Sequence, residues 1–199
     1  MLQLQTRVDE LYESAEYERA YVIYRDELAA VGDKYAQYMV GYMILSGKGA
    51  AHDPVQASAW YRLAAERGTP EFIMVRDELM QGLNDAQRLR SDQAYRELRS
   101  RYCDATLLLN AIRKDLGEYG ERTGSRITGS RGAPSTIIDK RTGRFMSGDD
   151  YYGRIRQQLE MNLKALARLL DADDMSTSPE SADIDQVEKL VAEYLEVLP

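Results

Sequence analysis

The sequence of 199 residues is poor in the side chains that most often carry chemistry. Its one cysteine, Cys103, and its one histidine, His52, exclude an intrachain disulfide framework and any metal site built from several of these residues. No apolar run approaches the roughly 18 residues that span a bilayer. The N-terminus lacks the pattern of a signal peptide. We therefore expect a cytoplasmic protein that has no membrane segment, binds no cofactor and is not an enzyme.

Positive charge is also scarce, since 26 basic residues stand against 33 acidic ones and the formal net charge is −7. This balance disfavours nucleic acid as a partner, because general nucleic-acid binding rests on net positive charge. The charge is nonetheless uneven. Residues 119–158 hold 8 basic and 4 acidic residues (net +4), whereas residues 159–199 hold 3 and 10 (net −7). Such asymmetry often marks an interaction surface.

The N-terminal half contains an internal repeat. Small, aromatic and basic residues recur after 37 or 36 residues: Ala20 with Ala57, Tyr24 with Tyr61, Arg25 with Arg62, Ala29 with Ala65, and Gly32 with Gly68. Together with the helical spacing of the apolar residues, this period predicts stacked helix–turn–helix units. Gly41 should let two helices approach closely. Asp53 and Pro54 should begin the second helix, and Gly68 should end it as a left-handed cap.

Residues 33–68 resemble the Sel-one-like repeat, a relative of the tetratricopeptide repeat. The resemblance rests on Tyr35-Ala-Gln-Tyr-Met-Val-Gly41, Gly47-Lys-Gly49, Asp53, Ala57, Trp60-Tyr61, Ala64-Ala65 and Gly68. Residues 1–32 resemble a degenerate preceding unit, and residues 69–103 resemble the closing helices of such arrays. The resemblance implies a short α-solenoid, here placed over residues 1–84, that acts as a protein-binding scaffold and has no enzymatic activity.

Residues 85–199 are expected to form a helical hairpin or bundle, which makes the whole chain all-α. Two apolar stripes have the 3, 4 spacing of a heptad seam: Tyr95, Leu98, Tyr102, Ala105, Leu109, Ile112 and Leu116, then Tyr152, Ile155, Leu159, Asn162, Leu166 and Leu169. The stripes can pair within one chain or between two copies, so a homo-oligomer stays an alternative. An acidic linker over 171–183 precedes a last helix over 183–198.

The segment 118–148, which separates the two stripes, is rich in glycine and predicts a break between helices. Residues 135–147 within it read as a small β-hairpin with a turn at Asp139–Gly143. The basic residues of this segment are Arg122, Arg126, Arg131, Lys140, Arg141 and Arg144. Arginine forks and glycine–serine turns can hold phosphate or carboxylate groups. The loop 122–144 is thus a candidate site for a phosphorylated small molecule, a nucleic acid or the acidic C-terminal helix, and a solvated loop is the alternative.

Tyrosine is concentrated near the N-terminus, where 8 of the 14 tyrosines lie in the first 61 residues. Tyrosine is enriched at protein interfaces because it combines contact area with a polar tip. Tyr35, Tyr38 and Tyr42 share one predicted helix, so at least one of them is expected to face a groove, although repeat packing alone accounts for Tyr38. The sequence therefore favours a bacterial-type adaptor that binds another protein through these tyrosines and through the basic loop.

Overall fold

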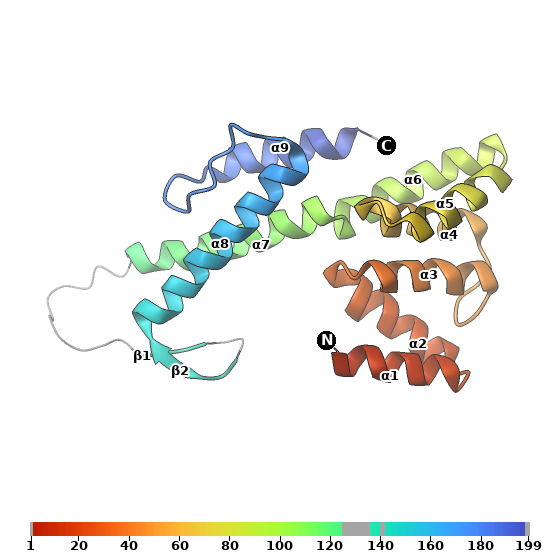
Figure 1. Cartoon of the computed structure of the whole chain (residues 1–199), viewed down its shortest axis with the longest axis horizontal. Helices are drawn as coiled ribbons and strands as arrows, with labels where there is room; N and C mark the ends of the chain where they lie inside the picture. The colour runs from red at the N-terminus through yellow and green to blue at the C-terminus, as the bar shows by residue number, and fades with distance from the viewer. Residues whose placement is uncertain (1, 125–135, 140–141, 198–199) are drawn as a thin grey trace, which may run out of the picture. The chain divides into compact units, whose positions relative to one another are not determined.

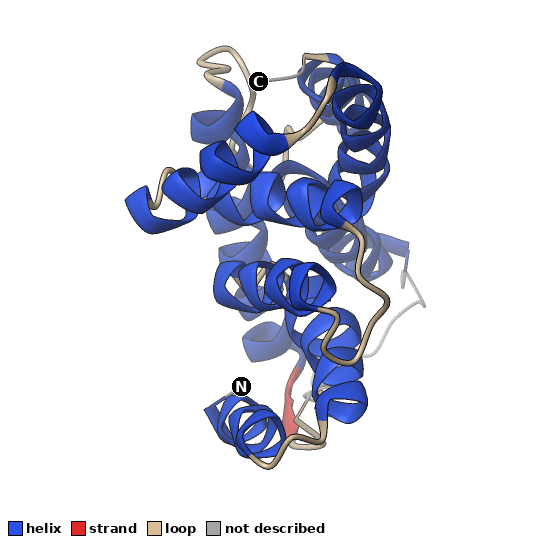
Figure 2. Ribbon diagram, turned by 90° about the vertical axis from the view of Figure 1, so that its right-hand side faces the viewer, coloured by secondary structure: helices blue, strands red, loops and turns tan. Residues whose placement is uncertain are grey.

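The computed structural model describes residues 2–124, 136–139 and 142–197, and most of this part of the chain is helical (Figures 1 and 2). The expected all-α class with a small β-hairpin is confirmed. The chain divides into two compact units, residues 1–107 and 108–199. The division lies beyond the boundary between residues 84 and 85 that the sequence favoured, because helix α6 (Asp85–Tyr102) contacts helix α4 (Pro54–Ala64) of the first unit. None of the described helices is long and apolar enough to cross a membrane.

The first unit is built from three consecutive pairs of helices that pack in series. Their bounds are α1 (Leu2–Glu13) and α2 (Tyr17–Ile23) with η1 (Tyr24–Leu28) and η2 (Ala29–Val31), then α3 (Lys34–Ser46) and α4 with η3 (Ala65–Arg67), then α5 (Pro70–Gly82) and α6. Helix α4 lies at the centre, in contact with α3, α5 and α6. The largest fully buried apolar side chains of this unit are Val8, Tyr24, Leu28, Val40, Met43, Tyr61 and Leu63.

The residues matched by the internal repeat occupy equivalent places in the first two pairs. Tyr24 and Tyr61 are each 1% exposed. Both pairs end in a 3₁₀ turn that is closed by a left-handed glycine, Gly32 at φ +85° and Gly68 at φ +75°. Glycine adopts this conformation without steric penalty, which is why it closes both turns. The period therefore corresponds to a repeated local structure.

The change in period from 37 to 36 residues has a structural cause. It falls between Arg25 and Ala29, where the first pair contains a π-helix over Tyr24–Leu28. The Ala29 N–H donates to the carbonyl oxygen of Tyr24, and such a bond spans one residue more than the bond of an α-helix. The extra residue of the first pair is accommodated in this turn.

The local signals between α3 and α4 act as the sequence predicted. A Cβ on Gly41 would lie 2.8 Å from the ring of Tyr61, so these two helices approach closely at that point. Helix α3 ends at Gly47, which is left-handed at φ +69°. The Asp53 side chain accepts hydrogen bonds from the N–H groups of residues 55 and 56 at 2.9 and 3.1 Å, and Pro54 opens α4.

The second unit contains most of α7 (Asp104–Gly124), the antiparallel strands β1 (Thr136–Ile138) and β2 (Phe145–Ser147), α8 (Gly148–Leu170) and α9 (Ile184–Glu196). Helix α8 packs against both strands and against α9. The hairpin turn is closed by Gly143 at φ +68°, and the Asp139 side chain accepts the hydroxyl hydrogen bond of Thr142 at 2.8 Å. The predicted hairpin and its turn are thus present. The fully buried apolar side chains of the helices are Ile112, Leu159, Leu163, Leu166, Val187 and Val191.

The first predicted apolar stripe is interrupted. Helix α6 ends at Tyr102, Cys103 is extended at ψ 157°, and α7 begins at Asp104. The buried Cys103 sulfur accepts a hydrogen bond from the Thr106 N–H at 3.4 Å, in the manner of an N-cap side chain. The expectation of one unbroken seam was wrong at this point: Tyr102 and Ala105 keep the apolar spacing on either side of the break, and Cys103 between them caps a new helix.

The second predicted stripe differs from the structure at Asn162, whose place in the buried row is taken by Leu163. The buried residues of α8 are Ile155, Leu159, Leu163 and Leu166. Asn162 lies beside this row, where its Nδ2 donates to Asp115 Oδ2 of α7 at 3.2 Å. A 4, 4, 3 spacing follows the 3.6-residue period of a straight helix, and a strict heptad belongs to a supercoil. These apolar side chains are buried within one chain.

Of the two predicted breaks, the first falls later than expected, because helix α7 continues past Gly117 and Gly120 to Gly124. Helix α7 can continue through its glycines because an isolated glycine lowers helix stability by only about 1 kcal/mol, which neighbouring contacts can outweigh. The second is where it was predicted: residues 171–183 connect α8, which ends at Leu170, to α9, which begins at Ile184, and the side chain of Met175 is buried within this linker.

Candidate functional site

An open pocket of about 470 Å³ lies in the first unit between α1, η1 and α3. Side chains from α1 and α3 line it together. The lining is aromatic and acidic: Tyr12, Tyr24, Tyr35, Tyr38, Tyr42, Asp9, Glu13 and Met39. We name it the tyrosine pocket. It contains all three tyrosines that the sequence singled out.

Helical spacing explains why these residues share one pocket. Tyr35, Tyr38 and Tyr42 are separated by three and four residues, so they lie on one face of α3. Asp9 lies three and four residues before Tyr12 and Glu13, which gives α1 a matching face. The sequence interpretation missed the α1 residues because they belong to the degenerate first unit. Their i, i+3, i+4 pattern was the signal that could have identified them.

The tyrosine rings form a connected row. Tyr24 meets Tyr35 edge to face, and Tyr35 stacks on Tyr38, each with 6.5 Å between ring centroids. Tyr38 in turn stacks on Tyr61 at 5.4 Å and on Phe72 at 5.1 Å. Tyr38 therefore packs against the second pair and also lines the pocket. Tyr35 is 46% exposed, so nearly half of its surface is accessible to solvent.

A lysine ammonium already lies against part of this aromatic cluster. The Nζ atom of Lys48 is 5.2 Å from the ring centroid of Tyr12, 5.1 Å from that of Tyr17 and 5.6 Å from that of Tyr42. It also donates a hydrogen bond to the Tyr12 hydroxyl oxygen at 3.0 Å, and this bond is the main reason why the pKa of Lys48 is raised. These distances are typical of cation–π contacts.

Asp9 supplies a fixed negative charge to the tyrosine pocket. Its Oδ1 atom accepts hydrogen bonds from the Tyr24 hydroxyl at 2.5 Å and from Gln5 Nε2 at 3.1 Å. Burial first, and the Asp9 carboxylate second, raise the pKa of Tyr24 far above its usual value, so this hydroxyl stays a donor. Among the described residues that line the pocket two are acidic and none is basic.

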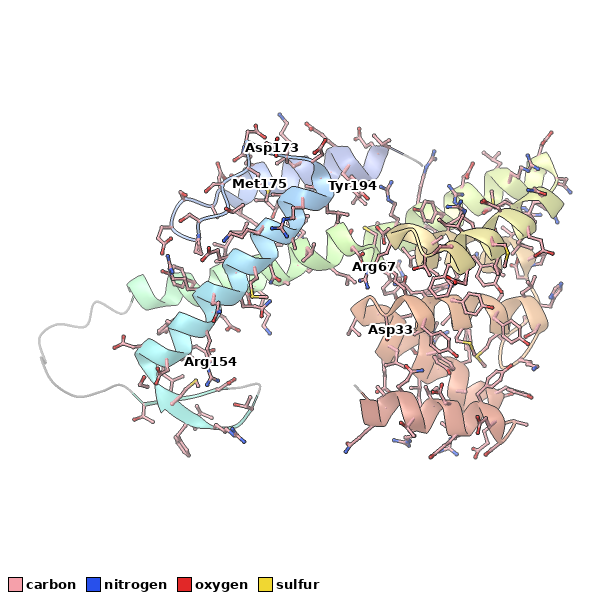
Figure 3. All side chains as sticks on the ribbon, in the orientation of Figure 1. Asp33, Arg67, Arg154, Asp173, Met175 and Tyr194 are labelled. Carbon is pink, nitrogen blue, oxygen red and sulfur yellow. The ribbon has the colours of Figure 1, made fainter. Side chains whose placement is uncertain are left out.

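An ion-pair network, partly buried, joins the start of α3 to η3 and to the start of α7. Lys34 Nζ lies 2.6 Å from Glu66 Oε2 and 3.2 Å from Asp104 Oδ1. Arg67 binds Asp104 through two nitrogens, at 2.7 and 2.9 Å. Burial acts to raise the pKa of Asp104, but the hydrogen bonds and charges of Arg67 and Lys34 lower it overall. The hydrogen bond to Asp104 is the main cause of the raised pKa of Arg67. The negative charge of Asp33, which lies at the same end of this unit, raises that pKa further (Figure 3).

The second unit has a smaller pocket of about 350 Å³ next to its β-hairpin. Its charged lining is mixed: Lys114, Asp115, Glu118, Asp139 and Arg154. Arg154 projects from the first turns of α8 (Figure 3). The Tyr151 hydroxyl donates to Glu118 Oε2 at 3.2 Å across the pocket. Because the lining carries charges of both signs, it favours no single class of ligand.

Most of the predicted basic site lies outside the described residues. This holds for Arg126, Arg131, Lys140 and Arg141, and for the side chain of Arg122. Arg144 is described and exposed, at the end of the hairpin turn, where its carbonyl oxygen accepts from the Asp139 N–H at 2.9 Å. Anion binding by the loop 122–144 stays a prediction.

The acidic C-terminal segment contacts basic side chains of the helices beside it. Glu180 pairs with Arg156 of α8 at 2.7 Å, and Glu188 of α9 pairs with Arg113 of α7 at 2.7 Å. The hydrogen bond from Arg156 lowers the pKa of Glu180 to about 2. Neither Arg156 nor Arg113 belongs to the basic loop 122–144, so the pairing of that loop with the acidic C-terminal helix stays a prediction.

The remaining candidates for chemistry are held in structural roles. His52 donates a ring N–H to the carbonyl oxygen of Leu45, and Asp53 caps α4. Within the described residues, no three or more His, Cys, Asp and Glu side chains are grouped so as to hold a metal ion. Comparisons of the chain with protein-family models, with curated proteins and with solved structures found no match.

Proposed function

We propose that this protein is a non-enzymatic cytoplasmic adaptor that binds a segment of another protein in the tyrosine pocket. The observation that carries the proposal is the convergence of five tyrosines from three helices on one open pocket. Tyrosine and arginine dominate the energetically important positions of protein interfaces, because a large rigid ring desolvates well and keeps a polar tip. A volume of about 470 Å³ suits a few side chains of a bound segment.

The rings of the tyrosine pocket are held in place before any partner binds. Tyr38 is fixed by stacking on Tyr61 and Phe72, and Tyr24 is fixed by its hydrogen bond to Asp9. Because these rings are already ordered, they lose less side-chain entropy when a partner binds. This order favours a standing binding surface over a site that forms only with its ligand.

We also propose that the first unit belongs to the Sel-one-like repeats. The motif of residues 33–68, the left-handed caps at Gly32 and Gly68, and the approach of Gly41 to Tyr61 support this assignment. Repeat arrays of this kind present a concave surface built from successive helices, and partners bind there. The tyrosine pocket is lined by the first helices of two successive pairs, α1 and α3, as such a surface requires.

A random-peptide display library selected on the immobilised full chain tests the proposed function. We expect enriched peptides that bind the wild-type chain and lose about tenfold or more in affinity for Tyr35→Ala, since truncation of a central interface tyrosine has effects of this size. Tyr35 is exposed, so its removal should leave the fold intact. Tyr21→Ala is the matched control, because Tyr21 lies on α2 outside the pocket. Peptides that bind Tyr35→Ala as tightly as wild type would contradict the proposal.

A further inference from the structure

We propose that the tyrosine pocket takes a cationic side chain, that of arginine or lysine, as the anchor of the bound segment. The inference rests on the proposed function and specifies the chemistry of the partner. It follows from three features of the pocket: its charge, its exposed ring faces, and a lysine of the chain that already uses the same rings.

The charge of the lining favours a cation. Asp9 and Glu13 reach the pocket from α1, and none of the described residues in the lining is basic. An acidic or phosphorylated segment would meet two carboxylates of like charge. An apolar anchor would displace water from the Asp9 carboxylate without returning a hydrogen bond, and desolvation of a charged group without compensation is unfavourable. A guanidinium or ammonium group satisfies these carboxylates.

The rings complete the site for a cation. A positive group is attracted to the face of a tyrosine ring within about 6 Å of its centroid. Tyr35 is 46% exposed and stands between Tyr24 and Tyr38 in the row of rings. The carboxylate of Asp9 is bonded to Tyr24, so negative charge and aromatic surface adjoin in one place.

Lys48 shows that these rings hold an ammonium group. Its Nζ atom lies 5.2 Å from the Tyr12 ring and 5.6 Å from the Tyr42 ring, and both rings belong to the tyrosine pocket. Lys48 itself comes from the loop after α3 and is not part of the lining. A cation from a partner therefore competes with the positive charge of Lys48. Lys48→Met should strengthen the binding of a cationic anchor by a few fold.

Titration of the full chain with Nα-acetyl-arginine amide and with the citrulline analogue, its neutral isostere, tests the inference. The reporter is the ¹³C-labelled methyl group of Met39, which lines the pocket. We expect the arginine compound to shift the Met39 signal in a saturable and salt-sensitive manner, and the citrulline compound to bind about tenfold more weakly or not at all. Equal affinity for the two compounds would overturn the inference.

A pair of charge variants on one helix sharpens the test. Glu13→Gln removes a carboxylate from the lining, whereas Glu10→Gln removes one from α1 outside the lining. We expect Glu13→Gln to weaken arginine binding several-fold and Glu10→Gln to have little effect. Equal effects of the two variants would show that only the overall charge matters and would overturn the inference.

The outcome of the display selection separates the two proposals. Peptides that depend on Tyr35 and carry an arginine or lysine at one recurrent position support both. Peptides that depend on Tyr35 and share a neutral or acidic anchor overturn the cationic anchor and leave the adaptor function standing. If no peptide depends on Tyr35, the proposed function fails, and the cationic anchor fails with it.

Discussion

Lys34→Met tests the energetic role of the ion-pair network in the first unit. The side chains of Lys34 and Glu66 are each 7% exposed and lie 2.6 Å apart, and Asp104 Oδ1 is 3.2 Å from the same ammonium. Without Lys34, two carboxylates stay close together and one of them is buried. Removal of one partner of a buried ion pair costs about 3–5 kcal/mol of stability. Because Arg67 still binds Asp104, we expect a loss at the lower end, about 3 kcal/mol.

A second substitution should restore much of this loss. Glu66→Gln removes the charge that Lys34→Met leaves without a partner, and its amide oxygen can still accept the Asp104 N–H, which lies 3.2 Å from Glu66 Oε2. We expect the double variant to be only about 1 kcal/mol less stable than wild type, which gives a coupling energy of about 2 kcal/mol or more. Urea denaturation followed by the fluorescence of Trp60, the single tryptophan, measures the stability of Lys34→Met, of Glu66→Gln and of the double variant.

The control is an exposed pair with the same geometry. Lys164 and Glu160 on α8 are also 2.6 Å apart, but their side chains are 50% and 35% exposed. Lys164→Met should therefore change stability far less than Lys34→Met does. Additive losses in the Lys34 and Glu66 variants, or a Lys34→Met variant as stable as wild type, would refute the reasoning about burial.

Three further predictions concern stability and reactivity. Gly41→Ala should destabilise the first unit by about 1–2 kcal/mol, because the new Cβ would lie 2.8 Å from the Tyr61 ring. Gly117→Ala should instead stabilise α7 by about 0.5–1 kcal/mol, because a Cβ at Gly117 meets nothing within 4 Å. Urea denaturation followed by circular dichroism measures both changes, and changes of the same sign would contradict the prediction. Burial raises the pKa of the Cys103 thiol, so a thiol reagent should react with it only after unfolding, and prompt reaction of the native chain would be evidence against its burial. Burial acts to raise the pKa of Asp104, but its basic partners hold that pKa below 3.8. The Asp104 carboxylate therefore stabilises the folded state above about pH 4, and this contribution is lost as the pH falls. The difference in stability between wild type and Asp104→Asn should shrink between about pH 5 and about pH 2, and a constant difference would exclude this linkage.

Features that depend on neighbouring residues could be predicted from the sequence. The cap at Asp53, the left-handed glycine at Gly68 and the hairpin turn ending at Gly143 each require only a few adjacent residues. The close approach at Gly41 was also predicted, because a glycine within an otherwise large-residue helix face marks a contact. Local chemistry of this kind is encoded within one turn of the chain.

Features that depend on tertiary contacts could not be predicted in full. The break at Cys103 was hidden because Tyr102 and Ala105 keep the apolar spacing across it, while the Cys103 sulfur caps α7. Three tyrosines of the tyrosine pocket were found from α3 alone, but Asp9 and Tyr12 come from α1 and reach the pocket only through the packing of the two helices. Arg126 and Arg131 of the basic loop lie outside the described residues.

The measurement that tests the central claim most directly is the contact map of a bound peptide. A peptide enriched by the selection, mixed with the full chain, should give intermolecular nuclear Overhauser effects to the ring protons of Tyr35, Tyr38 and Tyr42, and to those of Tyr12 on α1. Contacts to these four rings are the result that the tyrosine pocket predicts. Contacts confined to other surfaces of the chain would contradict it.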